Sequence, residues 1–147
     1  MQRDIVLRWI AQLAAIIARL LRRDPKLSLE LARQYLEEAE AQTLGPLGPL
    51  VAKLDAESAA RLLDDPHRIY GYCQILALAS ALTRVEGRLE EAEALARRAV
   101  AMGRAAVDRA EDPPEEWSEW LERASRDLFE PPSELTSEAS APDSRSS

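Results

Sequence analysis

The 147-residue sequence has little of the chemistry from which catalytic and metal sites are built. It contains one cysteine, Cys73, so no disulfide can form within the chain, and one histidine, His67. A metal site needs three or four ligands, and residues six positions apart do not share one helical face. No nucleophile–base or acid–base pair can be assembled around these residues. We therefore expect a non-enzymatic protein that uses no cofactor.

Glycine and aromatic residues are also scarce. Of five glycines, Gly45 and Gly48 are each followed by proline, which removes the amide donors that a phosphate-binding loop needs. Only 5% of residues are aromatic while 46% are hydrophobic, so a core must consist mostly of Leu, Ile, Val and Ala. Strong helix formers dominate, and the alternation typical of strands is missing. The composition predicts an all-α fold.

Long apolar runs and a general excess of basic charge are absent as well. Arg8, Gln12 and Arg19 interrupt the most apolar stretch, which leaves neither a membrane span nor a good signal-peptide core. The net charge is −7, and residues 111–147 carry eleven carboxylates against three arginines, which disfavours a nucleic-acid partner. With one cysteine, these features favour a cytoplasmic location.

What the sequence does contain is hydrophobic residues at helical spacing through most of its length. Three Asp-Pro dipeptides mark helix starts, because Asp caps a helix and Pro is tolerated at its first position. The pattern predicts about six helices, at residues 2–23, 25–42, 55–63, 66–86, 88–107 and 113–129. Residues 43–50, rich in Gly and Pro, are expected to form a connector that buries Leu44, Leu47 and Leu50.

We assign residues 1–129 to a single helical-bundle domain. Residues 130–147 are rich in Ser, Pro and carboxylates, and we expect this acidic tail to be disordered because it can bury little apolar surface. The centre of the domain is a predicted helix hairpin, residues 66–107, with its turn at Gly87.

This hairpin resembles a tetratricopeptide repeat. Small residues stand in the first helix, glycine at the turn, and alanines five and twelve positions later, as Ala79-Ser80, Gly87, Ala92 and Ala99. Thr83 and Ala96 stand where the repeat carries aromatic residues, and no second copy follows at a period of ~34 residues. The resemblance implies one repeat-like unit rather than a solenoid array.

Residues 1–110 as a whole resemble an uncharacterised bacterial family of small all-helical proteins. In that family an amphipathic N-terminal helix precedes a Gly-bearing connector and a single tetratricopeptide-like hairpin. The order here is IVLRWIAQLAAIIARLL, then TLGPLGPL, then the hairpin. The resemblance implies an all-helical fold and self-association, and it supplies no catalytic residues.

The predicted function is a protein-interaction or assembly module, with a homodimer or another protein as partner. The candidate partner-binding residues are Trp9, Arg84, Arg88, Arg97, Trp117 and Trp120. Tryptophan is enriched at interface hot spots. A pair such as Trp117 and Trp120 more often packs a terminal helix against the core, and we favour that interpretation for these two residues. Two alternatives are a small-ligand pocket with polar groups from Tyr35, Tyr70 or Tyr72, and peripheral membrane attachment through residues 2–23. The wide apolar face of residues 2–23 favours burial over membrane attachment.

Overall fold

The computed structural model describes residues 25–129, with side chains from Leu29 to Asp127. Its elements are α2 (Pro25–Leu44), the 3₁₀ turn η1 (Gly45–Leu47), α3 (Gly48–Lys53), α4 (Ala56–Leu63), α5 (Pro66–Val85), α6 (Leu89–Arg109) and α7 (Glu115–Phe129). This part of the chain contains no strand, which confirms the all-α prediction. The predicted helix 2–23, Trp9 and the tail 130–147 lie outside the described residues, and the expected count of about six helices included that first helix.

Two of the three Asp-Pro dipeptides begin a helix at the proline, α2 at Pro25 and α5 at Pro66, but α7 begins at Glu115, so the predicted start at residue 113 is wrong. The Asp55 carboxylate accepts a hydrogen bond from the Ser58 amide at 3.4 Å, and α4 begins at the next residue. Asp65 caps α5 by accepting from the His67 amide at 3.1 Å. Gly87 has a φ of +86°, the left-handed conformation that lets α5 end and α6 turn back without strain.

The connector differs from the prediction. Residues that were expected to interrupt helical structure continue it, first as η1 and then as α3. Pro49 lies in the first turn of α3, where a missing amide proton costs nothing because that amide has no partner within the helix. Leu44 is buried and Leu47 is half-buried, as expected, but Leu50 is 49% exposed, so the prediction for Leu50 is wrong.

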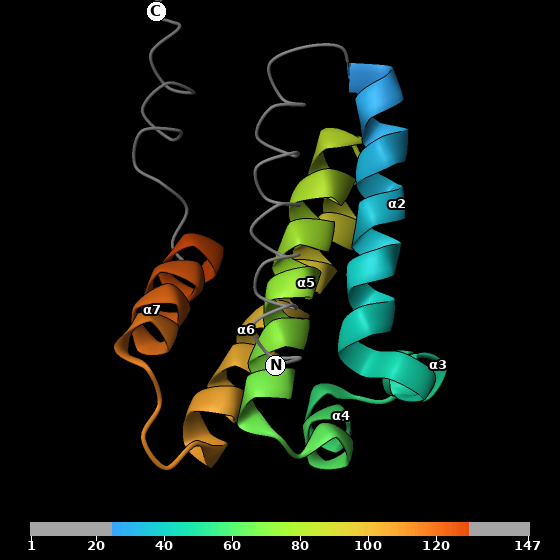
Figure 1. The fold of residues 1–147 in the computed structure, drawn as a ribbon. Coiled ribbons are helices and arrows are strands. Elements are labelled where there is room, and N and C mark those ends of the chain that lie inside the picture. Colours follow the sequence, from blue (N-terminus) through green and yellow to red (C-terminus); the bar gives the residue numbers. More distant parts are fainter. Residues whose placement is uncertain (1–24, 130–147) are drawn as a thin grey trace, which may run out of the picture.

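The hairpin of α5 and α6 forms the centre of the molecule (Figure 1). Helix α2 packs along one side of α5, α7 packs on α6, and α3 and α4 lie at the end where α5 begins. A larger core cluster joins α4, α5, α6 and the first turn of α7. A smaller cluster between α2 and α5 contains Ala32, Leu36, Ala39, Ile75 and Leu82.

Gly103 on α6 permits a close approach of α7. A Cβ atom at this position would lie 3.0 Å from Cζ3 of Trp120 and 3.2 Å from Sγ of Cys73. Both separations are shorter than ordinary carbon contacts. The glycine therefore lets Trp120 lie directly against the α6 backbone.

Candidate functional site

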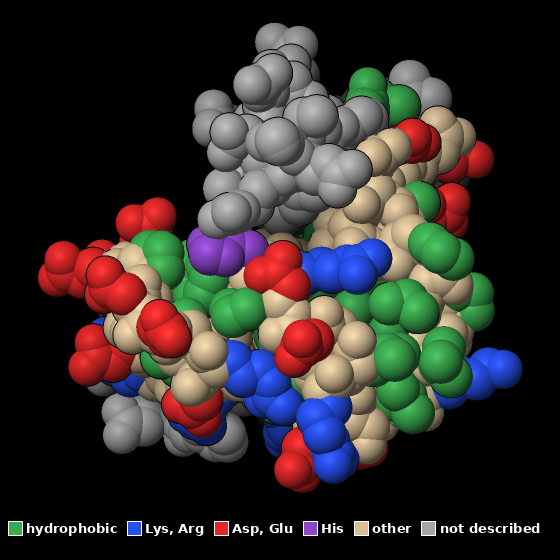
Figure 2. All heavy atoms as spheres, turned by 60° about the horizontal axis from the view of Figure 1, so that its bottom comes forward, with side chains coloured by type: hydrophobic (Ala, Val, Ile, Leu, Met, Phe, Trp, Pro, Cys, Tyr) green, Lys and Arg blue, Asp and Glu red, His purple; other side chains and the backbone are tan. Residues whose placement is uncertain are grey.

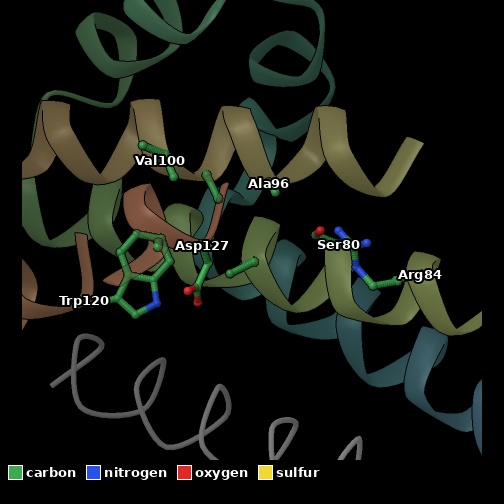
Figure 3. Close-up of a pocket in the computed structure, with 9 residues that line it drawn as sticks. Ser80, Arg84, Ala96, Val100, Trp120 and Asp127 are labelled. Atoms are coloured by element: carbon green, nitrogen blue, oxygen red, sulfur yellow. The ribbon is translucent and has the colours of Figure 1, made fainter. Parts of the chain in front are cut away.

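A groove of about 220 Å³ lies where α5, α6 and α7 meet (Figure 3). Its lining residues come from all three helices: Ala77, Ser80 and Arg84 from α5, Ala96, Ala99 and Val100 from α6, and Trp120, Ala124 and Asp127 from α7.

The groove exists because small side chains face one another across three helices. Ala77, Ala96 and Ala124 are each half-buried, and none reaches far enough to fill the space between its neighbours. Trp120 forms one wall of the groove and Val100 adds branched apolar surface. The surface inside the groove is therefore mainly apolar.

Polar groups are few in the groove, and one of them is already bonded. The Ser80 hydroxyl donates to the Ala92 carbonyl at 2.6 Å, which ties α5 to α6. Arg84 and Asp127 are exposed and bring opposite charges to the groove from different helices (Figure 3). Neither makes an ion pair with another residue in the described part of the chain. These two charges are available to a molecule in the groove.

The two described tryptophans pack α7 onto α5. Trp117 is 5% exposed and stacks on Tyr70, with ring centroids 4.5 Å apart and planes at 9°. The His67 ring meets the same indole edge-on at 5.0 Å. Trp120 makes an edge contact with Tyr70 at 6.3 Å and also lines the groove. Trp117 is therefore a core residue, whereas Trp120 faces the candidate site.

The other candidate arginines lie outside the groove lining. Arg88 pairs with Glu86 and, at 2.7 Å, with Glu91. Hydrogen bonds from Arg33 and Arg88 lower the pKa of Glu86 to about 2. Arg97 forms an exposed pair with Glu93 at 3.5 Å. Of the three predicted arginines, only Arg84 belongs to the site.

Sequence reasoning missed two arginines that hold the connector in place. Arg68 donates to the carbonyls of Thr43 at 2.9 Å and Leu44 at 3.0 Å, at the end of α2. Arg98 donates to the carbonyls of Val51 and Leu54, at the end of α3.

The guanidinium of Arg98 also donates to the Tyr72 hydroxyl at 3.2 Å and lies 5.6 Å from the centre of that ring. Cations favour the carbonyl end of a helix, where backbone oxygens lack amide partners. No local sequence signal could have found these contacts, because they join residues 24 to 47 positions apart.

Cys73 and the three tyrosines that were candidates for ligand binding pack within the fold and do not line the groove. Cys73 is fully buried, and burial raises the pKa of its thiol. No group of three or more His, Cys, Asp and Glu side chains within residues 25–129 is placed to hold a metal ion. Tyr70 and Tyr72 belong to the core, and Tyr35 packs beside the α2–α5 cluster, so none of them lines the groove.

Comparison with known proteins identifies no relative: no family model, no curated protein and no solved structure matches the chain. The resemblances to the tetratricopeptide repeat and to the family of small bacterial helical proteins therefore stay predictions. Among the described helices, none combines the length and the apolar character needed to cross a bilayer.

Proposed function

We propose that the protein is a non-enzymatic interaction module that accepts an amphipathic helix of a protein partner in the groove between α5, α6 and α7. The groove itself is the observation that carries this proposal. Its surface is mainly apolar, and it is flanked by Arg84 and Asp127. A helix in an apolar groove is a recurrent mode of protein recognition.

The dimensions of the hairpin suit such a partner. Helix α5 has 20 residues and is about 30 Å long, so a parallel or antiparallel partner helix can follow it for several turns. Alanines along the groove permit close approach, because helix axes pack 8–10 Å apart depending on the side chains between them. Apolar residues of the partner would enter the groove at every third or fourth position.

The apolar surface continues from the groove along α5. Leu78 and Ala81 are half-buried, and Val85 is 39% exposed. These positions follow helical spacing and leave a stripe of α5 that α2, α6 and α7 cover incompletely. A docked helix would therefore bury part of α5 as well as the groove.

We further propose that the α5–α6 hairpin acts as a single tetratricopeptide-like unit and that one of its partners is a second copy of the chain. The excess of partly covered apolar surface on α5 supports self-association. A cytoplasmic location is part of the same proposal. A small-molecule ligand has less support, because the groove is smaller than the roughly 300–1,000 Å³ of usual ligand pockets, whereas a partner helix would place only single side chains in it.

Two matched variants test the proposal. Ala96→Gln places a longer polar side chain in the groove, while Ala94→Gln makes the same change on the exposed face of α6. In sedimentation velocity at micromolar concentration, we expect a wild-type dimer, the same dimer for Ala94→Gln, and a shift to monomer for Ala96→Gln. A clean wild-type monomer would remove the self-association claim.

A photo-crosslinking amino acid at position 96, with position 94 as control, extends the test to other partners. Mass spectrometry of the adducts then identifies the chain in the groove. If position 96 gives no more protein adducts than position 94, the interaction proposal is wrong.

A further inference from the structure

The groove has a candidate occupant in the chain itself. We propose that residues 2–23 form the amphipathic helix that docks between α5 and α7 of the same chain, so that a partner must displace it. This inference rests on the proposed function, because it names the first occupant of the interaction groove. Five observations carry it: apolar spacing, length, the point of attachment, the open side of α5, and charge.

The spacing of apolar residues in the segment suits one-sided burial. Its most regular stripe consists of Ile5, Trp9, Leu13, Ile16 and Leu20, at intervals of three or four residues. The groove and the open stripe of α5 present a complementary apolar surface. Burial of such a stripe removes apolar area from water, which favours docking over exposure.

The length of the segment matches the surface that it would cover. Twenty-two helical residues extend about 33 Å, against about 30 Å for the 20 residues of α5. The segment is therefore long enough to cover the groove, whose α5 residues run from Ala77 to Arg84, and to continue beyond it. A much shorter segment would leave part of the α5 stripe exposed.

The point of attachment directs the segment towards α5. Only Asp24 separates it from the first residue of α2, and proline at position 25 disfavours a helical conformation for the residue before it. We therefore expect the chain to change direction at this point. The start of α2 lies near the end of α5, since Arg33 donates to Thr83 at 3.1 Å and pairs with Glu86 at 2.8 Å. A helix that folds back from there lies beside α5.

The other sides of α5 are already occupied, so the segment has one open side to cover. Helix α2 packs on one side of α5 and α6 on another (Figure 1). The remaining side, between α2 and α7, carries Ala77, Ala81 and Arg84, which are half-buried or exposed. The groove lies on this side, because Ala77 and Arg84 are among its lining residues.

Charge complementarity favours the same placement. The segment carries five arginines and one aspartate, a balance of +4. Helix α7 carries five carboxylates and two arginines, a balance of −3. Figure 2 shows acidic side chains gathered at the side of the molecule where α7 lies, and Asp127 adds a carboxylate within the groove. The acidic helix would attract the basic segment and set its orientation.

Attachment through one residue also favours the contact within a chain over the same contact between chains. A tethered segment meets its groove at an effective concentration of the order of millimolar, far above micromolar protein. A competing partner can enter only a groove from which the segment is absent. The partner's apparent affinity therefore falls in proportion to the fraction of molecules in which the groove is free. The groove is therefore covered by its own chain until a stronger helix replaces the segment, and the dimer expected at micromolar concentration requires that a second copy of the chain be such a competitor.

Cysteine cross-linking in the full chain tests this placement. Ala124→Cys puts a thiol in the groove, and Ser118→Cys puts one on the exposed face of the same helix as a matched control. Each is combined with single cysteines at successive positions from 9 to 17 and treated with a short bismaleimide. The native Cys73 is fully buried and does not compete for the reagent.

We expect cross-linked products of monomer mass with Ala124→Cys, in severalfold higher yield at apolar-stripe positions than at the positions between them. Ser118→Cys should give low yields without this periodicity. Equal yields for the two variants, or products only of dimer mass, would overturn the inference. Dimer-mass products would still support the proposed function, whereas photo-adducts at position 96 without any from residues 2–23 would leave that function standing alone.

Discussion

The two ends of the α5–α6 hairpin are held by different kinds of interaction. At the Gly87 end, Arg33, Glu86 and Arg88 form a chain of ion pairs with side chains 22–48% exposed. At the opposite end the contacts are buried and largely aromatic, and Trp117 stacks on Tyr70 above the larger core cluster.

The two ends of the hairpin have different roles: the aromatic end supplies stability and the charged end orients α2. Exposed ion pairs usually contribute less than about 1 kcal/mol each, whereas a buried tryptophan contributes several. The charged end therefore fixes how α2 meets the hairpin, and the aromatic end supplies most of the free energy that holds α7 in place. The groove lies beside the hairpin and shares Trp120 with the aromatic contacts. Its shape should thus depend more on the aromatic end.

The largest effect is expected from Trp117→Ala, which removes the aromatic contact. Loss of a buried indole should lower the free energy of unfolding by about 3–5 kcal/mol. Urea denaturation followed by circular dichroism measures this loss. Trp117→Phe, which keeps a ring against Tyr70, should cost less than half as much. A loss below about 1 kcal/mol for the alanine variant would show that this end does not dominate stability.

A smaller effect is expected from Arg98→Met, which keeps the aliphatic stem of the side chain and removes its hydrogen bonds. The carbonyls of Val51 and Leu54 would lose their partner, so the free energy of unfolding should fall by about 2–3 kcal/mol. Arg98→Lys keeps the charge but lacks the planar guanidinium that donates to both carbonyls. It should therefore recover only part of the lost free energy of unfolding. Thermal unfolding of wild type, Arg98→Lys and Arg98→Met measures the expected decrease in stability in that order, and equal melting temperatures would contradict it.

The smallest effect is expected from Glu86→Gln, at the charged end. At neutral pH the variant should lose about 1 kcal/mol of stability. The pKa of Glu86 is about 2 in the folded chain, below its ordinary value of 4.5. The stabilisation is therefore complete above pH 4.5 and is lost as the pH falls towards 2. Wild type and variant should converge over that range in urea titrations, and a constant difference down to pH 2 would refute the assignment.

The parts of the fold that local chemistry decides could be predicted from the sequence. Asp55 and Asp65 cap helices because their carboxylates reach amides two or three residues ahead. Gly87 turns the chain because glycine accepts a positive φ. The short helix α3 was missed because proline was taken as a stop, although proline is equally suited to a first turn.

The candidate site could be predicted only in part. Arg84 and Trp120 were selected from the sequence and line the groove, while Arg88 is engaged in ion pairs outside it. The groove depends on which alanines from three helices face one another, and that is decided by packing between residues far apart in the chain. Arg33 and Glu86, 53 positions apart, show the same limit, because no pattern in the sequence marks them as partners.

The arginines at the connector have a consequence for how freely this segment can change in sequence. Arg68 and Arg98 bind the connector only through carbonyl oxygens, which every amino acid possesses. Substituting exposed connector residues such as Leu50 leaves these acceptors in place. The path of the chain between α2 and α4 therefore depends on two side chains from outside it as well as on the buried Leu44 and Val51. Mutational tolerance should be high at the exposed connector residues and low at the two arginines.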